Sequence, residues 1–110
     1  MIKKGEIWVV ELSSKGGREQ EGRRPAVIIE DTSTSLALVI PLTANIKALT
    51  ILPFTTLLSP SSINNLNHNS VALVSQLQAV DKIRLISKIG VLDNSYLVEI
   101  NRILKKLLQI

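Results

Sequence analysis

Arg24 is the side chain of this sequence whose type and position best suit work on a phosphate. It precedes Pro25, and proline restricts the residue before it to extended backbone conformations. A guanidinium whose backbone is held in this way can bind phosphate through two parallel hydrogen bonds. Glu19 and Glu21 are close in the sequence, so an ion pair with one of them is the alternative role that the residues leave open.

Composition excludes several other kinds of catalytic or metal site. The chain has no cysteine, which rules out disulfides, thiolate metal sites such as zinc fingers, and thiol nucleophiles. His68 is the only histidine, so a pair of histidines for acid–base ribonuclease chemistry cannot form within one chain. Because His68 lies among asparagines in a polar segment, we expect it to be an exposed loop residue. The sequence predicts no metal and no cofactor.

Charge is distributed unevenly along the chain. The net charge is +4 and the sequence pI is about 9.7. Between Thr32 and Val80 the only charged residue is Lys47, whereas basic residues are found before that segment and again from Lys82 onward. If both ends of the chain fold together, they would form one basic face that suits a polyanionic partner. Scattered solubilising charge is the alternative.

Length and hydropathy fit one small domain with a protein partner. The 110 residues suffice for a single domain, residues 1–110. Apolar residues make up 45% of the chain and mean hydropathy is +0.28, which is high for so small a protein. A symmetric dimer is the commonest way to cover such apolar surface. No apolar run suits a signal peptide or a membrane span, so we expect a cytoplasmic protein.

Most of the sequence is typical of short β-strands. Runs rich in β-branched residues recur, each bounded by polar or turn residues. The expected strands are 7–10, 26–29, 36–40, 52–57, 71–74, 76–80 and 86–91. This pattern predicts an all-β barrel or a strongly bent sheet. No long helical period lies between the strands, which argues against a parallel α/β fold.

The C-terminal segment changes to a helical period. Asp93 or Asn94 can cap a helix, and the apolar residues that follow fall on one side at helical spacing. These apolar residues are Leu97, Ile100, Leu104, Leu107 and Leu108. We expect an amphipathic helix packed on the sheet, with a helix on a membrane surface as the alternative.

Two polar segments are expected to be loops. Residues 13–24 are charged, contain glycines and lie between two strands, whereas residues 59–70 are rich in asparagine and serine. Long loops often carry function, but many are simple connections. We expect a functional role for the first loop and a plain connection for the second.

Three stretches carry motifs in a definite order over nearly the whole chain. The first stretch contains GEI at 5–7, which opens a strand, and EQEGRRP at 19–25, which precedes the next strand. The second is IPLT at 40–43, which ends a strand on threonine. The third is SVALVSQLQAVDKIRL at 70–85. Together they resemble the MazF/PemK toxin family, with its G-[DE]-[IV] strand, S-E-Q-x-G-x-R-P loop and S-V-[AI]-L-x-x-Q-[IV]-x-[TS]-[IV]-D-K-x-R-L stretch. Arg18 departs from this pattern, since the family usually has serine or a similar small residue there.

The resemblance implies both a fold and an activity. The family's fold is an SH3-like barrel of short, strongly bent antiparallel strands with a C-terminal helix, assembled as a homodimer. Its members cleave single-stranded RNA, such as mRNA, at short specific sequences without a metal, and a cognate antitoxin holds them inactive. Carried over to this sequence, the catalytic residues are Arg24 and Thr43. The implied RNA-binding residues are Arg18, Glu19, Gln20 and Gln76.

Chemistry limits the roles of these residues. Metal-free cleavage uses the ribose 2′-OH as nucleophile and leaves a 2′,3′-cyclic phosphate and a 5′-OH. Arg24 keeps its proton, so it cannot be the base; stabilising phosphorane charge, worth roughly 3–4 kcal/mol per well-placed donor, suits it better. Thr43 can donate to a phosphate oxygen or position the 2′-OH, although a hydroxyl bonded to local backbone is its alternative. Glu19 is the only nearby candidate base, and an ion pair with Arg18 or Arg24 explains it equally well.

Two other functions are possible for such a fold. The first is a non-catalytic toxin that binds a topoisomerase, like gyrase poisons of the CcdB kind, but these use a tryptophan-containing C-terminal end and this chain ends LLQI. The second is a non-catalytic RNA-binding module, and the presence of both Arg24 and Thr43 argues against it. Base stacking on an aromatic platform is also poorly supported, because the chain has only three aromatic residues and Trp8 is expected in the core.

Overall fold

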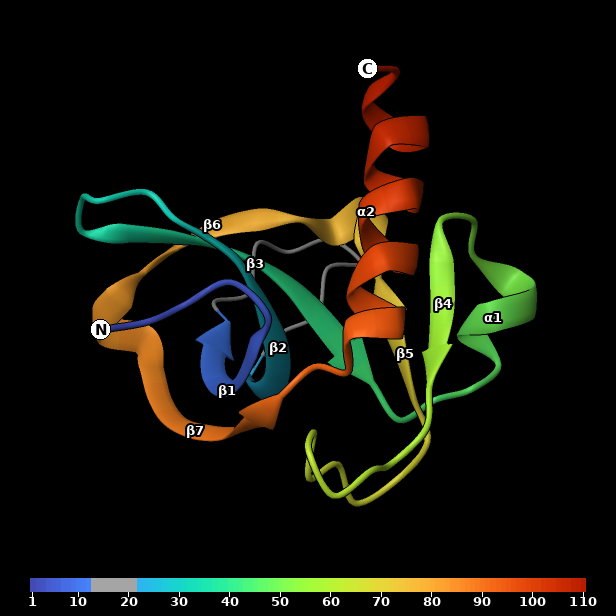
Figure 1. Ribbon diagram of the computed structural model, residues 1–110, viewed down its shortest axis with the longest axis horizontal. Helices are drawn as coiled ribbons and strands as arrows, with labels where there is room; N and C mark the ends of the chain where they lie inside the picture. The colour runs from blue at the N-terminus through green and yellow to red at the C-terminus, as the bar shows by residue number, and fades with distance from the viewer. Residues whose placement is uncertain (13–21) are drawn as a thin grey trace.

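The computed structural model describes residues 1–12 and 22–110 and shows a mainly β fold with one long helix (Figure 1). The strands are β1 (Glu6–Leu12), β2 (Gly22–Asp31), β3 (Leu36–Thr43), β4 (Thr55–Leu58), β5 (Ser70–Leu73), β6 (Gln78–Asp81) and β7 (Leu85–Val91). The helices are α1 (Ala48–Ile51) and α2 (Asn94–Leu108), and 3-10 turns at Val74–Gln76 and Lys82–Arg84 flank β6. The predicted mainly β class and the C-terminal helix are confirmed.

Every strand pair is antiparallel, and the sheet stays open within the part of the chain that the structure describes. The order is β4-β5-β3-β2-β1-β7, with β6 also paired to β3. The path therefore ends at β4 on one side and at β7 on the other.

The sheet bends along β3. One edge of β3 pairs with β2, while the other edge pairs first with β6, through Leu36 to Val39, and then with β5, through Leu42 and Thr43. A register shift in β2, between Ile28 and Glu30, adds to the curvature, because a bulge bends the strand that carries it. The first half of β3 therefore pairs with β6, whereas Thr43 at its end pairs with β5.

The middle of β2, residues 26–29, is buried on both faces. Val27 and Ile29 lie in the large core cluster beneath α2, while Ala26 and Ile28 lie in a second cluster on the other face of the sheet. Because successive side chains of a strand point to opposite faces, an uninterrupted apolar run such as 26–29 needs cover on both sides. Trp8 is half-buried against the second cluster, and its indole N–H donates to Glu6 Oε1 at 3.0 Å, so it lies at the edge of the core.

α2 covers the large cluster with one apolar side. Ile100 and Ile103 are buried there. Leu97, Leu104 and Leu107 pack against the same cluster. The prediction for Leu108 was wrong: it is 52% exposed, because the C-terminal end of α2 extends beyond the strands (Figure 1). None of the described helices is long and apolar enough to cross a membrane.

The segment before β4 differs from the predicted strand 52–57. α1 occupies Ala48–Ile51, and β4 begins only at Thr55. Phe54, with a φ of 56°, takes a left-handed conformation that interrupts the apolar run. A helix of a single turn is too short to show a helical period in the sequence, which is why α1 was not predicted.

The packing of α2 gives a direct test of its buried side. Ile100→Ala removes a fully buried side chain from the large cluster, so we expect the free energy of unfolding to fall by about 2–5 kcal/mol in urea denaturation. Leu108→Ala on the same helix is the control and should change it by less than about 0.5 kcal/mol. Equal losses for the two variants would contradict the orientation of α2.

Candidate active site

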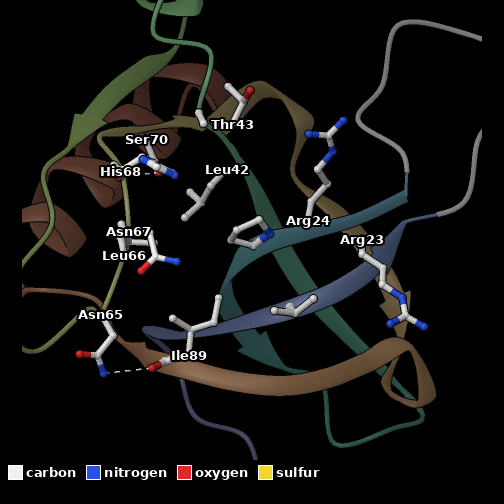
Figure 2. A pocket seen from close by; sticks show the side chains of 13 residues that line it. Arg23, Arg24, Leu42, Thr43, Asn65, Leu66, Asn67, His68, Ser70 and Ile89 are labelled. Carbon is white, nitrogen blue, oxygen red and sulfur yellow. Dashed lines mark hydrogen bonds between the residues drawn. The ribbon is translucent and has the colours of Figure 1, made fainter.

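A pocket opens at one end of the sheet, where β2 begins and β3 ends (Figure 2). Its volume is about 360 Å³, within the range of small-ligand sites. The apolar residues that line it are Val9, Pro25, Leu42, Ala44, Leu66 and Ile89. The polar and charged ones are Arg23, Arg24, Thr43, Asn65, Asn67, His68 and Ser70. Three separate parts of the chain thus meet here: the strand ends, the 59–70 loop and β7.

Strand register brings Arg24 and Thr43 together. Ala26 of β2 pairs with Pro41 of β3 in an antiparallel register. Arg24 lies two residues before Ala26, and Thr43 lies two residues after Pro41, so both project from the same end of this strand pair. The two residues that the sequence analysis predicted to be catalytic therefore line one pocket.

Arg24 is an exposed cation on a held backbone. The sequence predicted that Arg24 precedes the strand, but it is the third residue of β2. The strand begins at Gly22, whose φ of 76° is a conformation that favours glycine. Arg24 pairs with Val10 of β1. The neighbouring Arg23 lies 3.6 Å from Glu11, through Nε and Oε1, and its side chain points in a different direction from that of Arg24 (Figure 2). Arg24 and Thr43 line the same pocket, and in Figure 2 the Arg24 side chain extends on the side of the view where Thr43 lies.

Thr43 is held by the local contact that was its predicted alternative role. Its side chain is nearly buried, and Oγ1 accepts a hydrogen bond from the backbone N–H of Asn45 at 3.2 Å. A threonine hydroxyl has one proton and two acceptor sites, so an oxygen that accepts this bond still has a proton to donate. The local bond therefore fixes the hydroxyl at the pocket without using up its donor.

The 59–70 loop is built around one buried amide. Asn64 is fully buried, and its Oδ1 accepts from the backbone N–H of Ser61 at 2.9 Å and of Leu66 at 3.0 Å. Its Nδ2 donates to Ser59 O at 3.0 Å and to Asp93 Oδ1 at 2.7 Å, just before α2. The 59–70 loop, predicted to be a plain connection, is held by the hydrogen bonds of this buried side chain and forms one wall of the pocket.

β7 holds the same loop from the other side. Val91 N donates to Ile63 O at 3.1 Å, and Asn65 Nδ2 donates to Ile89 O at 3.1 Å (dashed in Figure 2). Gly90 makes this close approach possible, since a Cβ there would lie 2.6 Å from the carbonyl oxygens of both Ile63 and Asn64. The loop and β7 therefore form one unit beside the strand ends.

Asp93 receives two hydrogen bonds where this loop meets α2. Burial raises the pKa of Asp93, but hydrogen bonds from Ser61 and Asn64 outweigh it, so the pKa lies below its ordinary value. The carboxylate form is thus the form that the folded chain favours.

Of the remaining predicted site residues, the structure describes Gln76 alone. Arg18, Glu19 and Gln20 fall outside the described residues. Gln76 is half-buried in the 3-10 turn after β5 and is not among the described residues that line the pocket. No three described His, Asp or Glu side chains are grouped as metal ligands would be.

The residues of the second wall were not predicted from the sequence. His68 is exposed, as predicted, but it lines the pocket together with Asn65 and Asn67. Two signals pointed to it: it is the only histidine of the chain, and it lies two residues before the SVAL motif. With Arg24, Thr43 and these side chains around apolar residues, the pocket has the groups needed to bind a phosphate and a neighbouring ring or sugar.

Comparison with known proteins gives this pocket a context. A family model described as PemK-like, MazF-like toxin of type II toxin–antitoxin system matches residues 3–108. The chain belongs to this family. The match runs from the residues before β1 to the end of α2, so the MazF/PemK domain accounts for the whole described fold.

Individual MazF proteins are similar over almost the full chain. The endoribonuclease MazF9 of Mycobacterium tuberculosis is 32% identical over 96% of this chain and 94% of its own length. The endoribonuclease MazF of Staphylococcus epidermidis is 31% identical over 94% of this chain and 88% of its own. The crystal structure of MazF from Deinococcus radiodurans has the same fold, with a TM-score of 0.81 at 24% identity over 99% of this chain and 97% of that one.

The buried amide of Asn64 can be tested for its structural role. Asn64→Ala removes four hydrogen bonds and leaves their partners unsatisfied, so we expect the free energy of unfolding to fall by about 2–4 kcal/mol in urea denaturation. Asn69→Ala, an exposed asparagine of the same loop, is the control and should change it by no more than about 0.5 kcal/mol. A similar, small effect for both variants would show that the loop does not depend on Asn64.

The lowered pKa of Asp93 predicts a dependence of stability on acid pH. A folded-state pKa below the unfolded value stabilises the fold above the unfolded pKa, and this contribution is lost as the pH falls through the folded pKa. We therefore expect Asp93→Asn to reduce the loss of melting temperature as the pH falls below about 4. An unchanged slope in the variant would contradict the role of Asp93.

Proposed function

We propose that this chain is an endoribonuclease toxin that cleaves single-stranded RNA at short sequences without a metal ion. The observation that carries the proposal is the position of Arg24 and Thr43 in one pocket at the end of the β2–β3 pair. Membership of the MazF/PemK family supports it, as does the endoribonuclease activity named for relatives at 31–32% identity.

The pocket suits the transesterification that metal-free RNA cleavage requires. The ribose 2′-OH attacks the adjacent phosphorus, and the bond to the 5′-oxygen breaks, leaving a 2′,3′-cyclic phosphate and a 5′-OH. Arg24 binds the non-bridging oxygens and stabilises the negative charge that grows on them. Thr43, whose hydroxyl proton remains available while Oγ1 accepts from Asn45, donates to the same phosphate.

RNA recognition in this proposal involves the four predicted RNA-binding residues and amides of the 59–70 loop. Arg18, Glu19 and Gln20 belong to the segment between β1 and β2. This segment ends where β2 begins at Gly22, two residues before Arg24. Gln76 lies in the turn after β5, is not among the described residues that line the pocket, and would contact nucleotides flanking the cleavage site. Hydrogen bonding by these residues and by the Asn65 and Asn67 amides would select the sequence.

A cognate antitoxin and a second copy of the chain are the proposed protein partners. Solved complexes of similar fold include an endoribonuclease with its cognate antitoxin from a mycobacterial species, with a TM-score of 0.78, and MazE–MazF from Deinococcus radiodurans, with a TM-score of 0.76. Exposed apolar side chains around α1, among them Ile46, Ile51 and Leu52, give this chain surface for such contacts.

The activity can be tested with purified protein and a long single-stranded RNA in EDTA. We expect discrete cuts with 5′-OH ends, and Arg24→Ala should lower the single-turnover rate roughly 10²–10³-fold. Arg102→Ala is the matched control, because it removes the same charge from the exposed face of α2, where Arg102 pairs with Glu99 at 2.8 Å.

Two results would count against the enzyme. Intact RNA across many sequence contexts would overturn the proposed activity, and RNA that is bound but never cut would favour a non-catalytic module. A loss of activity in Arg102→Ala equal to that in Arg24→Ala would mean that general charge, rather than the pocket, determines cleavage.

A further inference from the structure

His68 stands on the wall of the pocket opposite Arg24. Figure 2 shows it near Ser70 and Asn67, with Leu42 between it and Arg24 in this view, and all of these residues line the same pocket. Its side chain is exposed, so the imidazole is accessible to a substrate that enters the pocket.

The backbone that carries His68 is held at both ends of its loop. Ser70 Oγ donates to His68 O at 3.1 Å, and Ser70 itself begins β5, paired with Leu58 of β4. At the other end, Asn64 fixes the loop by its four hydrogen bonds. Because the backbone is already fixed, positioning the imidazole against a reacting atom restricts only the two side-chain torsion angles of His68.

Among the described residues that line the pocket, the titratable ones are Arg23, Arg24 and His68. The two arginines keep their protons at any working pH, and no carboxylate is among these described lining residues. Imidazole, with an ordinary pKa of about 6.5, is the side chain that exchanges a proton most readily near neutral pH. Among the described residues that line the pocket, therefore, His68 is the one suited to accept a proton during the reaction.

We propose that His68 is the general base of the cleavage step, an inference that rests on the proposed endoribonuclease function. Neutral imidazole accepts the proton of the ribose 2′-OH while the bond from the 2′-oxygen to phosphorus forms. The bond from phosphorus to the 5′-oxygen breaks, and that oxygen takes a proton from water. The imidazolium then releases its proton to solvent, so the protein returns to its starting state.

This assignment divides the pocket between two tasks. In this proposal, Arg24 and Thr43 at the strand ends hold the phosphate, and His68 on the loop across the pocket takes the proton of the sugar hydroxyl. A base and a charge-stabilising cation on opposite walls can act on one phosphodiester together without forming an ion pair, since neutral imidazole carries no charge.

The experiment uses the full chain and an RNA oligonucleotide containing one cleavage site mapped in a long RNA. Single-turnover rates are measured in EDTA from about pH 5 to 8.5. For the wild-type chain we expect the rate to rise with pH and then level off, as a single base loses its proton. His68→Gln should cut the same site roughly 10²–10³-fold more slowly and should lose this rise.

Three further arms separate a base from a merely structural residue. Adding free imidazole to His68→Ala should restore part of the rate, because a small base can enter the vacated space. Asn69→Ala, next to His68 but not among the lining residues, should keep the wild-type rate and pH profile. RNA affinity and melting temperature should be nearly unchanged in His68→Gln, since the side chain is exposed.

The outcomes distinguish this inference from the function on which it rests. A wild-type chain that cuts RNA while His68→Gln cuts at a similar rate, or keeps the same pH profile, would overturn the role of His68 alone. A profile that persists in His68→Gln but disappears in Glu19→Gln would assign the base to Glu19 instead. A wild-type chain that cuts no RNA would overturn both proposals.

Discussion

The fully buried amide of Asn64 joins the parts of the chain on which the pocket depends. Its hydrogen bonds hold the 59–70 loop in shape, and one of them, to Asp93, ties that loop to the start of α2. A buried amide of this kind is costly unless all its groups are paired, so the loop has little freedom to adopt another conformation. One polar side chain thereby gives a long, irregular segment the fixed shape that a binding wall requires.

The opposite wall is fixed by a different physical device, the register of a strand pair. The antiparallel pairing of Ala26 with Pro41 determines that Arg24 and Thr43 project from the same end of the sheet. The burial of β2 on both faces stabilises this register, since a slip of one residue would exchange the two buried faces. Backbone pairing therefore positions the two proposed phosphate-binding residues, and a side-chain network positions the loop across from them.

The two walls differ in the chemistry they can supply. The strand ends contribute a permanent cation and a hydroxyl donor, whereas the loop contributes amides and the one histidine of the chain. In this chain, the loop is where proton transfer and part of the selectivity are proposed to reside, and Gly90 of β7 allows it to pack close enough to form the pocket.

The sequence by itself determined the mainly β class, the C-terminal helix and the family, because strand alternation, helical period and ordered motifs are local properties. It also singled out Arg24 and Thr43, each through its own motif. Only the tertiary structure decided that these two residues meet, since strand register depends on burial of both faces of β2. It likewise decided that the 59–70 loop is a wall rather than a connection, and that His68 faces the pocket. Those outcomes depend on the hydrogen bond from Asn64 to Asp93 and on the close approach of the loop backbone to Gly90. Both are contacts between segments far apart in the chain.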